Sequence, residues 1–162
     1  MKRLKIYLDT STISHLDAPD APDKMNDTLK LWDDIKSGKY EVFISHVVVL
    51  ELDGCAEPKL SNLVNQLQAI EYTELQANDE VLELAAQYLK AGILPPKSAR
   101  DRQHIAYACV YDCDMIVSWN FKHMVNYKTI SGVKSVNALA GYKEMSIYTP
   151  TMLIEGGNEN DT

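Results

Sequence analysis

Short apolar runs alternate with longer amphipathic stretches along this chain. The short runs are rich in β-branched and aromatic residues, as at Leu4–Leu8 and at Val42, Phe43 and Ile44. The longer stretches repeat apolar residues every three or four positions, which is the spacing of a helix that packs one face on a core. The alternation of the two patterns is typical of an α/β domain, in which helices cover the faces of a sheet.

The pattern also predicts where the elements lie. Strands are predicted at residues 4–8, 42–45, 70–74, 114–118 and 145–149. Helices are predicted at residues 12–16, 24–36, 47–54, 59–69, 78–91, 98–112, 121–125 and 133–141. Glycine and proline support these divisions, since Gly38 follows one helix, and Gly92 with Pro95 and Pro96 closes another. Ser98 stands where the N-cap of the next helix is expected.

Length and composition favour one domain. The chain has 162 residues, of which 46% are hydrophobic, enough for a single core. We expect this domain to span residues 1–150, followed by a C-terminal tail at 151–162 that is disordered at its end. No apolar run reaches the roughly 18 residues that cross a bilayer, and no signal-peptide pattern follows Met1. The expectation is a cytoplasmic protein with no membrane contact.

Charge and cysteine content narrow the function classes. A formal net charge of −7 argues against general electrostatic binding of nucleic acid, although it leaves open nucleic acid that is reached through a bound metal. The 3 cysteines are odd in number and lie in apolar surroundings, which favours reduced thiols over a disulfide framework. A zinc site at Cys109, Cys113 and His104 would lack a fourth ligand.

Three carboxylates stand in unusual places. Glu51 lies in the predicted helix “HVVVLEL”, which is apolar nearly all round. A buried, unpaired carboxylate is costly, so Glu51 either occupies a narrow exposed face or binds a metal. Asp101 shares a helical face with Ile105 and Ala108, but Ser98–Asp101 also fits a capping box. Asp9 follows the first strand and is equally suited to cap the next helix.

The positions of these acids together point to a ligand site. In a parallel sheet, ligands bind beyond the carboxyl ends of the strands. Asp9, Glu51 and Asn120 each follow a predicted strand, and Asp101 reaches the same crevice if its helix begins there. Converging carboxylates suit Mg²⁺ or Mn²⁺, and such a site suits phosphodiester hydrolysis. Basic neighbours either hold the substrate strand or are ordinary surface charges: His46, Lys97, Arg100, Arg102, Lys122 and His123.

The motifs resemble those of the PIN domains, in particular the toxin-like proteins of the VapC kind. The resemblance rests on “IYLDTSTI”, “HVVVLEL” and “RDRQHIAYACVYDCDMIVSWNFKHM”, in that order, and covers about residues 4 to 148. It implies a three-layer α/β/α fold around a mainly parallel sheet. It also implies a Mg²⁺- or Mn²⁺-dependent endoribonuclease, the toxin of a toxin–antitoxin pair.

The resemblance implies a role for individual residues. Asp9, Glu51 and Asp101 resemble the acidic metal ligands. Thr10, Ser11 and Ser118 resemble the hydroxyls that support the acids or contact phosphate, and Arg102 and Lys122 are candidates for binding substrate. Asn120 stands where relatives often have a fourth catalytic Asp, and it brings no charge; Asp114 begins its strand and is a poor substitute.

Partners and alternatives follow from the same resemblance. Relatives commonly form homodimers and are inhibited by an antitoxin. The apolar residues of segment 59–91 are a candidate surface for binding an antitoxin, although such residues more often belong to a core. Because Asn120 replaces an acid, the alternative is a weak or inactive PIN-like scaffold that binds a partner. Phosphoaspartyl-transfer and receiver domains fit poorly, since Ser11 stands where the former need a second Asp.

Overall fold

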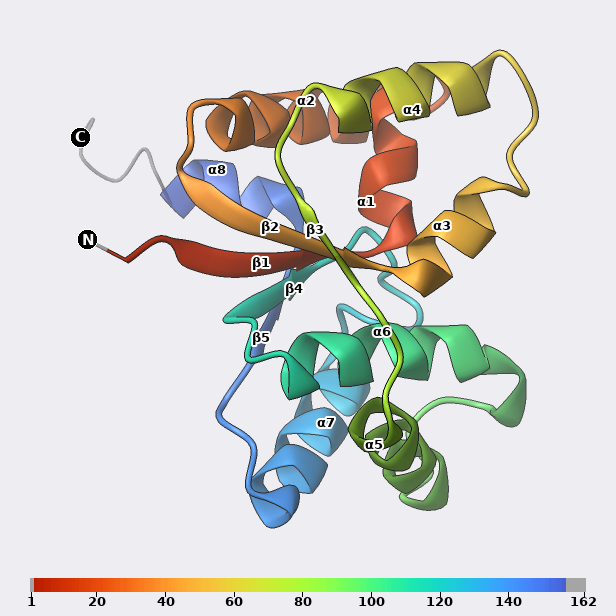
Figure 1. Cartoon of the computed structure of the whole chain (residues 1–162), viewed down its shortest axis with the longest axis vertical. Coiled ribbons are helices and arrows are strands. Elements are labelled where there is room, and N and C mark those ends of the chain that lie inside the picture. Colours follow the sequence, from red (N-terminus) through yellow and green to blue (C-terminus); the bar gives the residue numbers. More distant parts are fainter. Residues whose placement is uncertain (1, 157–162) are drawn as a thin grey trace.

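The sheet is entirely parallel. A computed structural model describes residues 2–156 (Figure 1). Within them, five strands form one sheet in the order β3-β2-β1-β4-β5. All four neighbouring pairs are parallel. The strands are β1 (Leu4–Leu8), β2 (Tyr40–Ser45), β3 (Thr73–Leu75), β4 (Met115–Val117) and β5 (Ser146–Tyr148). The predicted α/β class and parallel sheet are confirmed.

Helices cover both faces of this sheet, which makes three layers. In Figure 1, α1, α2, α4 and α8 lie on one side of the sheet, and α5, α6 and α7 lie on the other. The α-helices are α1 (Thr10–Ser14), α2 (Pro22–Lys36), α3 (His46–Leu52), α4 (Lys59–Gln68), α5 (Asp79–Lys90), α6 (Ala99–Val110), α7 (Tyr127–Ala140) and α8 (Pro150–Gly156). Short 3₁₀ turns are η1 (His15–Asp17) and η2 (Pro96–Ser98).

The central strands form the core, and the strand order reverses between two of them. Ile6, Tyr7 and Leu8 in β1 are fully buried, as expected of a strand with helices on both faces. The chain adds β2 and β3 on one side of β1, and β4 and β5 on the other. The strand order therefore reverses between β1 and β4, and the carboxyl ends of these two strands flank the crevice where such folds bind ligands.

The helix predicted at residues 121–125 is absent, and the one predicted at residues 133–141 begins earlier. Residues 121–125 form turns, because side chains satisfy the backbone there: Asn120 Oδ1 accepts from His123 N at 2.9 Å, and Asn126 Nδ2 donates to Phe121 O at 3.0 Å. The helix predicted at 133–141 starts at Tyr127, where Asn126 is its N-cap. The first turn of this helix lacks the regular apolar spacing, so the spacing of apolar residues did not predict where the helix begins.

The C-terminal segment is helical where a tail was predicted. Pro150–Gly156 form α8, which packs on α2. The predicted disorder at the chain's end concerns residues 157–162, which lie outside the described residues. The thiols of Cys55, Cys109 and Cys113 are free, in agreement with the cysteine prediction. Within residues 2–156, no helix combines the length and apolar composition needed to cross a membrane.

Candidate active site

Asp9 is a buried carboxylate at the carboxyl end of β1. Its side chain is the N-cap of α1 and accepts from Thr12 N at 3.1 Å, so the capping role proposed for it is real. Ser11 Oγ donates to Oδ1 at 2.7 Å, and Ser118 Oγ donates to Oδ2 at 2.5 Å. Burial raises the pKa of Asp9, while nearby His104 and the two serine hydroxyls oppose that rise. The charged form of Asp9 is thus costly here and depends on its polar neighbours.

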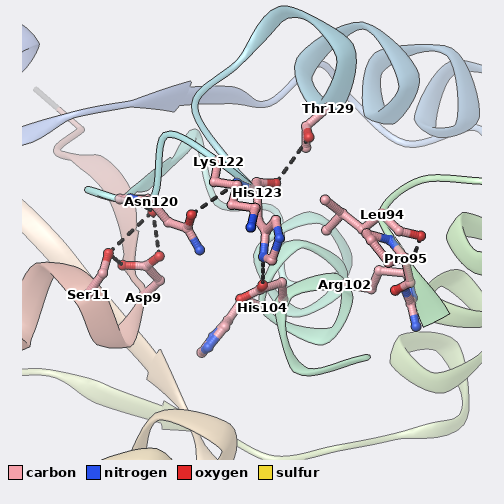
Figure 2. A network of polar contacts seen from close by, with 12 residues as sticks. Asp9, Ser11, Leu94, Pro95, Arg102, His104, Asn120, Lys122, His123 and Thr129 are labelled. Atoms are coloured by element: carbon pink, nitrogen blue, oxygen red, sulfur yellow. Dashed lines mark hydrogen bonds and ion pairs between the residues drawn. The ribbon is translucent and has the colours of Figure 1, made fainter. Parts of the chain in front are cut away.

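The two serines also join the ends of β1 and β4. Ser11 Oγ accepts from Trp119 N at 2.9 Å, and Ser118 Oγ accepts from Asn120 N at 3.0 Å. Each hydroxyl therefore donates to Asp9 and accepts from the loop after β4. Figure 2 shows Asp9 and Ser11 beside Asn120 in this arrangement. The structure brings both predicted supporting serines onto the carboxylate that they were expected to support.

Glu51 extends from α3, which starts directly after β2. Its Oε1 accepts from Thr10 Oγ1 at 2.9 Å and lies 2.6 Å from His104 Nε2. The Glu51 side chain is 26% exposed, so it is neither fully buried nor on an open face. Burial raises the pKa of Glu51, but His104, Thr10 and Arg100 together outweigh burial and hold the pKa below its usual value. Glu51 is therefore ionised at neutral pH.

His104 links Glu51 to the core through a chain of buried polar groups. Its Nδ1 lies 2.6 Å from the Tyr7 hydroxyl, which lies 2.7 Å from Ser45 Oγ. His104 is 2% exposed, and Ser45 is the N-cap of α3. In the sequence, His104 is a candidate only for a zinc site with Cys109 and Cys113, so its bond to Glu51 is not predicted. The available signal was a histidine within an apolar helical run, since such a residue needs a hydrogen-bond partner when buried.

Asp101 pairs with His123 instead of closing a capping box. Ser98 is the N-cap of α6, but its side chain makes no capping hydrogen bond, so the capping-box alternative is wrong. Asp101 Oδ2 lies 2.9 Å from His123 Nδ1, which comes from the loop before α7. Glu51 and Asp101 then border the same cleft of about 300 Å³. The other residues lining it are Lys97, Ser98, Arg100 and His123.

The remaining predicted residues have different surroundings. Asn120 follows β4, and its side-chain Oδ1 accepts from the backbone N–H of His123, which positions His123. Lys122 is exposed at the surface. The buried guanidinium of Arg102 donates to the carbonyls of Leu94, Pro95 and Pro96 at 3.4, 2.7 and 3.0 Å, two of which Figure 2 shows. Arg102 therefore supports a loop, and its predicted alternative role of binding substrate does not fit this arrangement.

The fold has been seen before in solved structures. VapC20 from Mycobacterium tuberculosis, a sarcin-ricin loop cleaving toxin, matches with a TM-score of 0.55 and 16% identity over 86% of this chain and 98% of its own. VapBC2 from Rickettsia felis, bound to a DNA fragment from its promoter, matches with a TM-score of 0.55 and 15% identity. This match covers 90% of this chain and 98% of the other. VapBC-1 from nontypeable Haemophilus influenzae matches with a TM-score of 0.57 and 14% identity. This match covers 91% of this chain and 99% of the other. The chain has a PIN-like fold. No protein-family model and no curated protein matches the sequence.

Two of the predicted metal ligands, Glu51 and Asp101, each engage only one carboxylate oxygen in a hydrogen bond with other described residues. Within residues 2–156, no group of three or more His, Cys, Asp or Glu is arranged to hold a metal ion. The predicted ligands Asp9, Glu51 and Asp101 thus do not surround one point. Mg²⁺ needs only one or two direct carboxylates, and the hydrogen bonds of Glu51 and Asp101 use one oxygen each. Among residues 2–156, the second oxygen of each accepts no hydrogen bond and could serve as such a ligand.

Proposed function

We propose that this protein is a Mg²⁺- or Mn²⁺-dependent endoribonuclease that hydrolyses RNA phosphodiester bonds at the cleft lined by Glu51 and Asp101. The observation that carries the proposal is the shared cleft of Glu51 and Asp101, together with the link from Glu51 through Thr10 to the neighbouring Asp9. These acids come from three different elements and lie at the end of the sheet where such folds bind ligands.

The residues of the cleft have separate roles in this reaction. Glu51 and Asp101 would hold the cation, which when bound activates water and stabilises charge on the phosphoryl oxygens. Against the effect of burial, His104, Thr10 and Arg100 hold the pKa of Glu51 below its ordinary value, so Glu51 needs no proton loss at neutral pH to act as a ligand. Ser11 and Ser118 fix the orientation of Asp9. Lys97 and Arg100 are exposed at the cleft and attract the anionic RNA.

The biological setting that we propose is a toxin–antitoxin pair. One matched structure is named as a toxin, and two are VapBC proteins. By analogy, this chain would be a cytoplasmic toxin, form a homodimer, and be inhibited by an antitoxin protein. This part of the proposal rests on fold likeness, whereas the chemistry rests on the residues of the cleft.

A specific observation favours a second candidate, a PIN-like scaffold that binds a partner without catalysis. Asn120 brings no charge to the carboxyl end of β4, and the acids do not gather around one point. Titration with Mn²⁺ separates the candidates, since a scaffold has no need for the ion. Saturable Mn²⁺ binding that Asp101→Asn weakens favours the enzyme, and no binding favours the scaffold.

The decisive test is the cleavage of RNA by Asp9→Asn in the presence of Mn²⁺. We expect the variant to lose about 100-fold or more of its activity, because Asp9 is the third predicted acid of the site and adjoins Thr10, which bonds Glu51. Asp20→Asn is the matched control, since Asp20 is exposed in the loop before α2. A chelator should abolish cleavage by the wild type and by the control. Normal cleavage by Asp9→Asn would show that the site assignment is wrong.

A further inference from the structure

A second, larger pocket lies next to the cleft of the acids. Its volume is about 570 Å³, and His123 borders both spaces. Residues 91–95, from the loop after α5, form one wall. The other wall comes from the loop before α7 and from the first turns of that helix, with Lys122, His123, Asn126, Lys128, Thr129 and Gly132.

The first wall is apolar and fixed in place. Ile93, Leu94 and Pro95 provide its carbon surface. Arg102 holds the carbonyls of Leu94, Pro95 and Pro96 from behind. Leu94 also has a φ of 67°, a left-handed backbone that costs energy in a residue with a side chain. The hydrogen bonds of Arg102 hold this strained loop, so the wall exists before any ligand arrives.

The second wall is polar and is fixed as well. Asn126 Nδ2 donates to Phe121 O at 3.0 Å and to Lys122 O at 2.9 Å, while Thr129 Oγ1 donates to His123 O at 3.0 Å. Figure 2 shows Thr129, His123 and Lys122 on one side and Leu94, Pro95 and Arg102 on the other. Both walls are therefore tied to helices, as in binding sites that are largely preformed.

We propose that this pocket binds one nucleobase of the substrate RNA, next to the scissile phosphate, an inference that rests on the proposed function. The apolar wall suits the face of a base, and the polar wall suits its edges. Lys122 and Lys128 are exposed at the pocket and attract the adjoining phosphates. Because His123 borders both spaces, a strand with one phosphate at the acids reaches the pocket with a neighbouring nucleotide. In a chain of net charge −7, Lys97, Arg100, Lys122 and Lys128 place positive charge along this path.

The first experiment measures nucleotide binding without metal. Backbone amide signals of Gly92 and Gly132 report on the pocket by NMR, since both glycines line it, and those of Gly38 and Gly141 serve as remote references. The probes are the four ribonucleoside monophosphates at millimolar concentration. We expect at least one of them to shift the two pocket signals and to leave the references unchanged. No shift of the pocket signals with any of the four would overturn the proposal.

A bulky variant tests the location. Ala91→Phe places a ring at the pocket, and Ala69→Phe is the matched control because both alanines are exposed C-caps, of α5 and α4 respectively. Nucleotide shifts should persist in Ala69→Phe and disappear in Ala91→Phe. Equal shifts in the two folded variants would place nucleotide binding elsewhere and overturn the assignment.

The second experiment separates this inference from the proposed function. A pool of RNAs with random sequence is cleaved with Mn²⁺, and the bases flanking each cut are determined. We expect Ala91→Phe to weaken the base preference beside the cut and to lower kcat/KM about tenfold or more, mainly by raising KM. Unchanged preference and KM would refute the pocket and leave the nuclease intact. Nucleotide shifts at Gly92 and Gly132 in a protein that cleaves no RNA would support the pocket and refute the nuclease.

Discussion

The substitution His104→Phe tests the buried chain that holds Glu51. Phenylalanine fills a similar volume, so the main change is the loss of both imidazole nitrogens. The bond to the Tyr7 hydroxyl is worth about 1 kcal/mol, and the bond to the Glu51 carboxylate is worth about 1.5–3 kcal/mol. Tyr7 keeps Ser45 as a partner and Glu51 keeps Thr10, so neither is left without a hydrogen bond. We therefore expect the free energy of unfolding to fall by about 2–4 kcal/mol.

Urea denaturation measures this loss. His46→Phe is the matched control, because His46 is exposed at the start of α3, and it should change stability by less than about 0.5 kcal/mol. A cycle that combines His104→Phe with Tyr7→Phe should give a coupling energy of at least about 0.5 kcal/mol. If His104→Phe unfolds at the same urea concentration as the wild type, the chain from Tyr7 to Glu51 contributes no stability and the reasoning fails.

The same variant has a defined pH dependence. The pKa of Glu51 is held below its ordinary value of 4.5, so ionised Glu51 stabilises the fold at neutral pH. This contribution is lost as the pH falls through the lowered pKa. The stability difference between wild type and His104→Phe should consequently be largest near neutral pH and shrink below pH 4.5. A difference that grows towards acid pH would contradict the assignment of Glu51 as the partner of His104.

Three further predictions concern single residues. Asn120→Asp restores a charge and should raise Mn²⁺ affinity or cleavage by about tenfold; no change in a folded variant would place Asn120 outside the site. Arg102→Met removes the bonds to three carbonyls and should lower the unfolding free energy by about 3 kcal/mol or more, with Arg102→Lys intermediate in urea titrations. Burial raises the pKa of Asp9, so its ionisation destabilises the fold as the pH rises through that value. The stability of Asp9→Asn relative to wild type should therefore rise as the pH rises to neutrality, and a relative stability that stays constant or falls over this range would contradict this.

The sheet was predictable because its strands are simple in sequence. β1 and β2 contain the buried apolar runs at residues 6–8 and 42–44, and such a run flanked by turns indicates a buried parallel strand. The start of α7 was not predictable from the same pattern. Its first turn packs little apolar surface, and its position is set by the cap at Asn126. The hydrogen bonds of Asn126 with the nearby backbone determine where the helix begins. The spacing of apolar residues contains no information about such bonds.

The acids of the proposed site were easier to predict than their hydrogen-bond partners. Asp9, Glu51 and Asp101 each conflict with an apolar neighbourhood, so the sequence alone marks them. The partners of Glu51 and Asp101 lie far away along the chain: His104 is 53 positions from Glu51, and His123 is 22 positions from Asp101. Such pairs depend on the packing of α6 against α3 and on the course of the loop before α7. A single sequence shows that a buried acid needs a partner, but only the fold identifies it.

These partners explain how the three acids are tolerated in one region of the fold. Glu51 has His104 and Thr10, Asp101 has His123, and Asp9 has the hydroxyls of Ser11 and Ser118. Each carboxylate is thus compensated separately, which fits their failure to surround one point. A cation that entered the cleft would add to these contacts on Glu51 and Asp101, because each histidine bonds one oxygen and the other oxygen is left. His104 and His123 thus fix where the two carboxylates of the cleft stand, because each histidine bonds one of them.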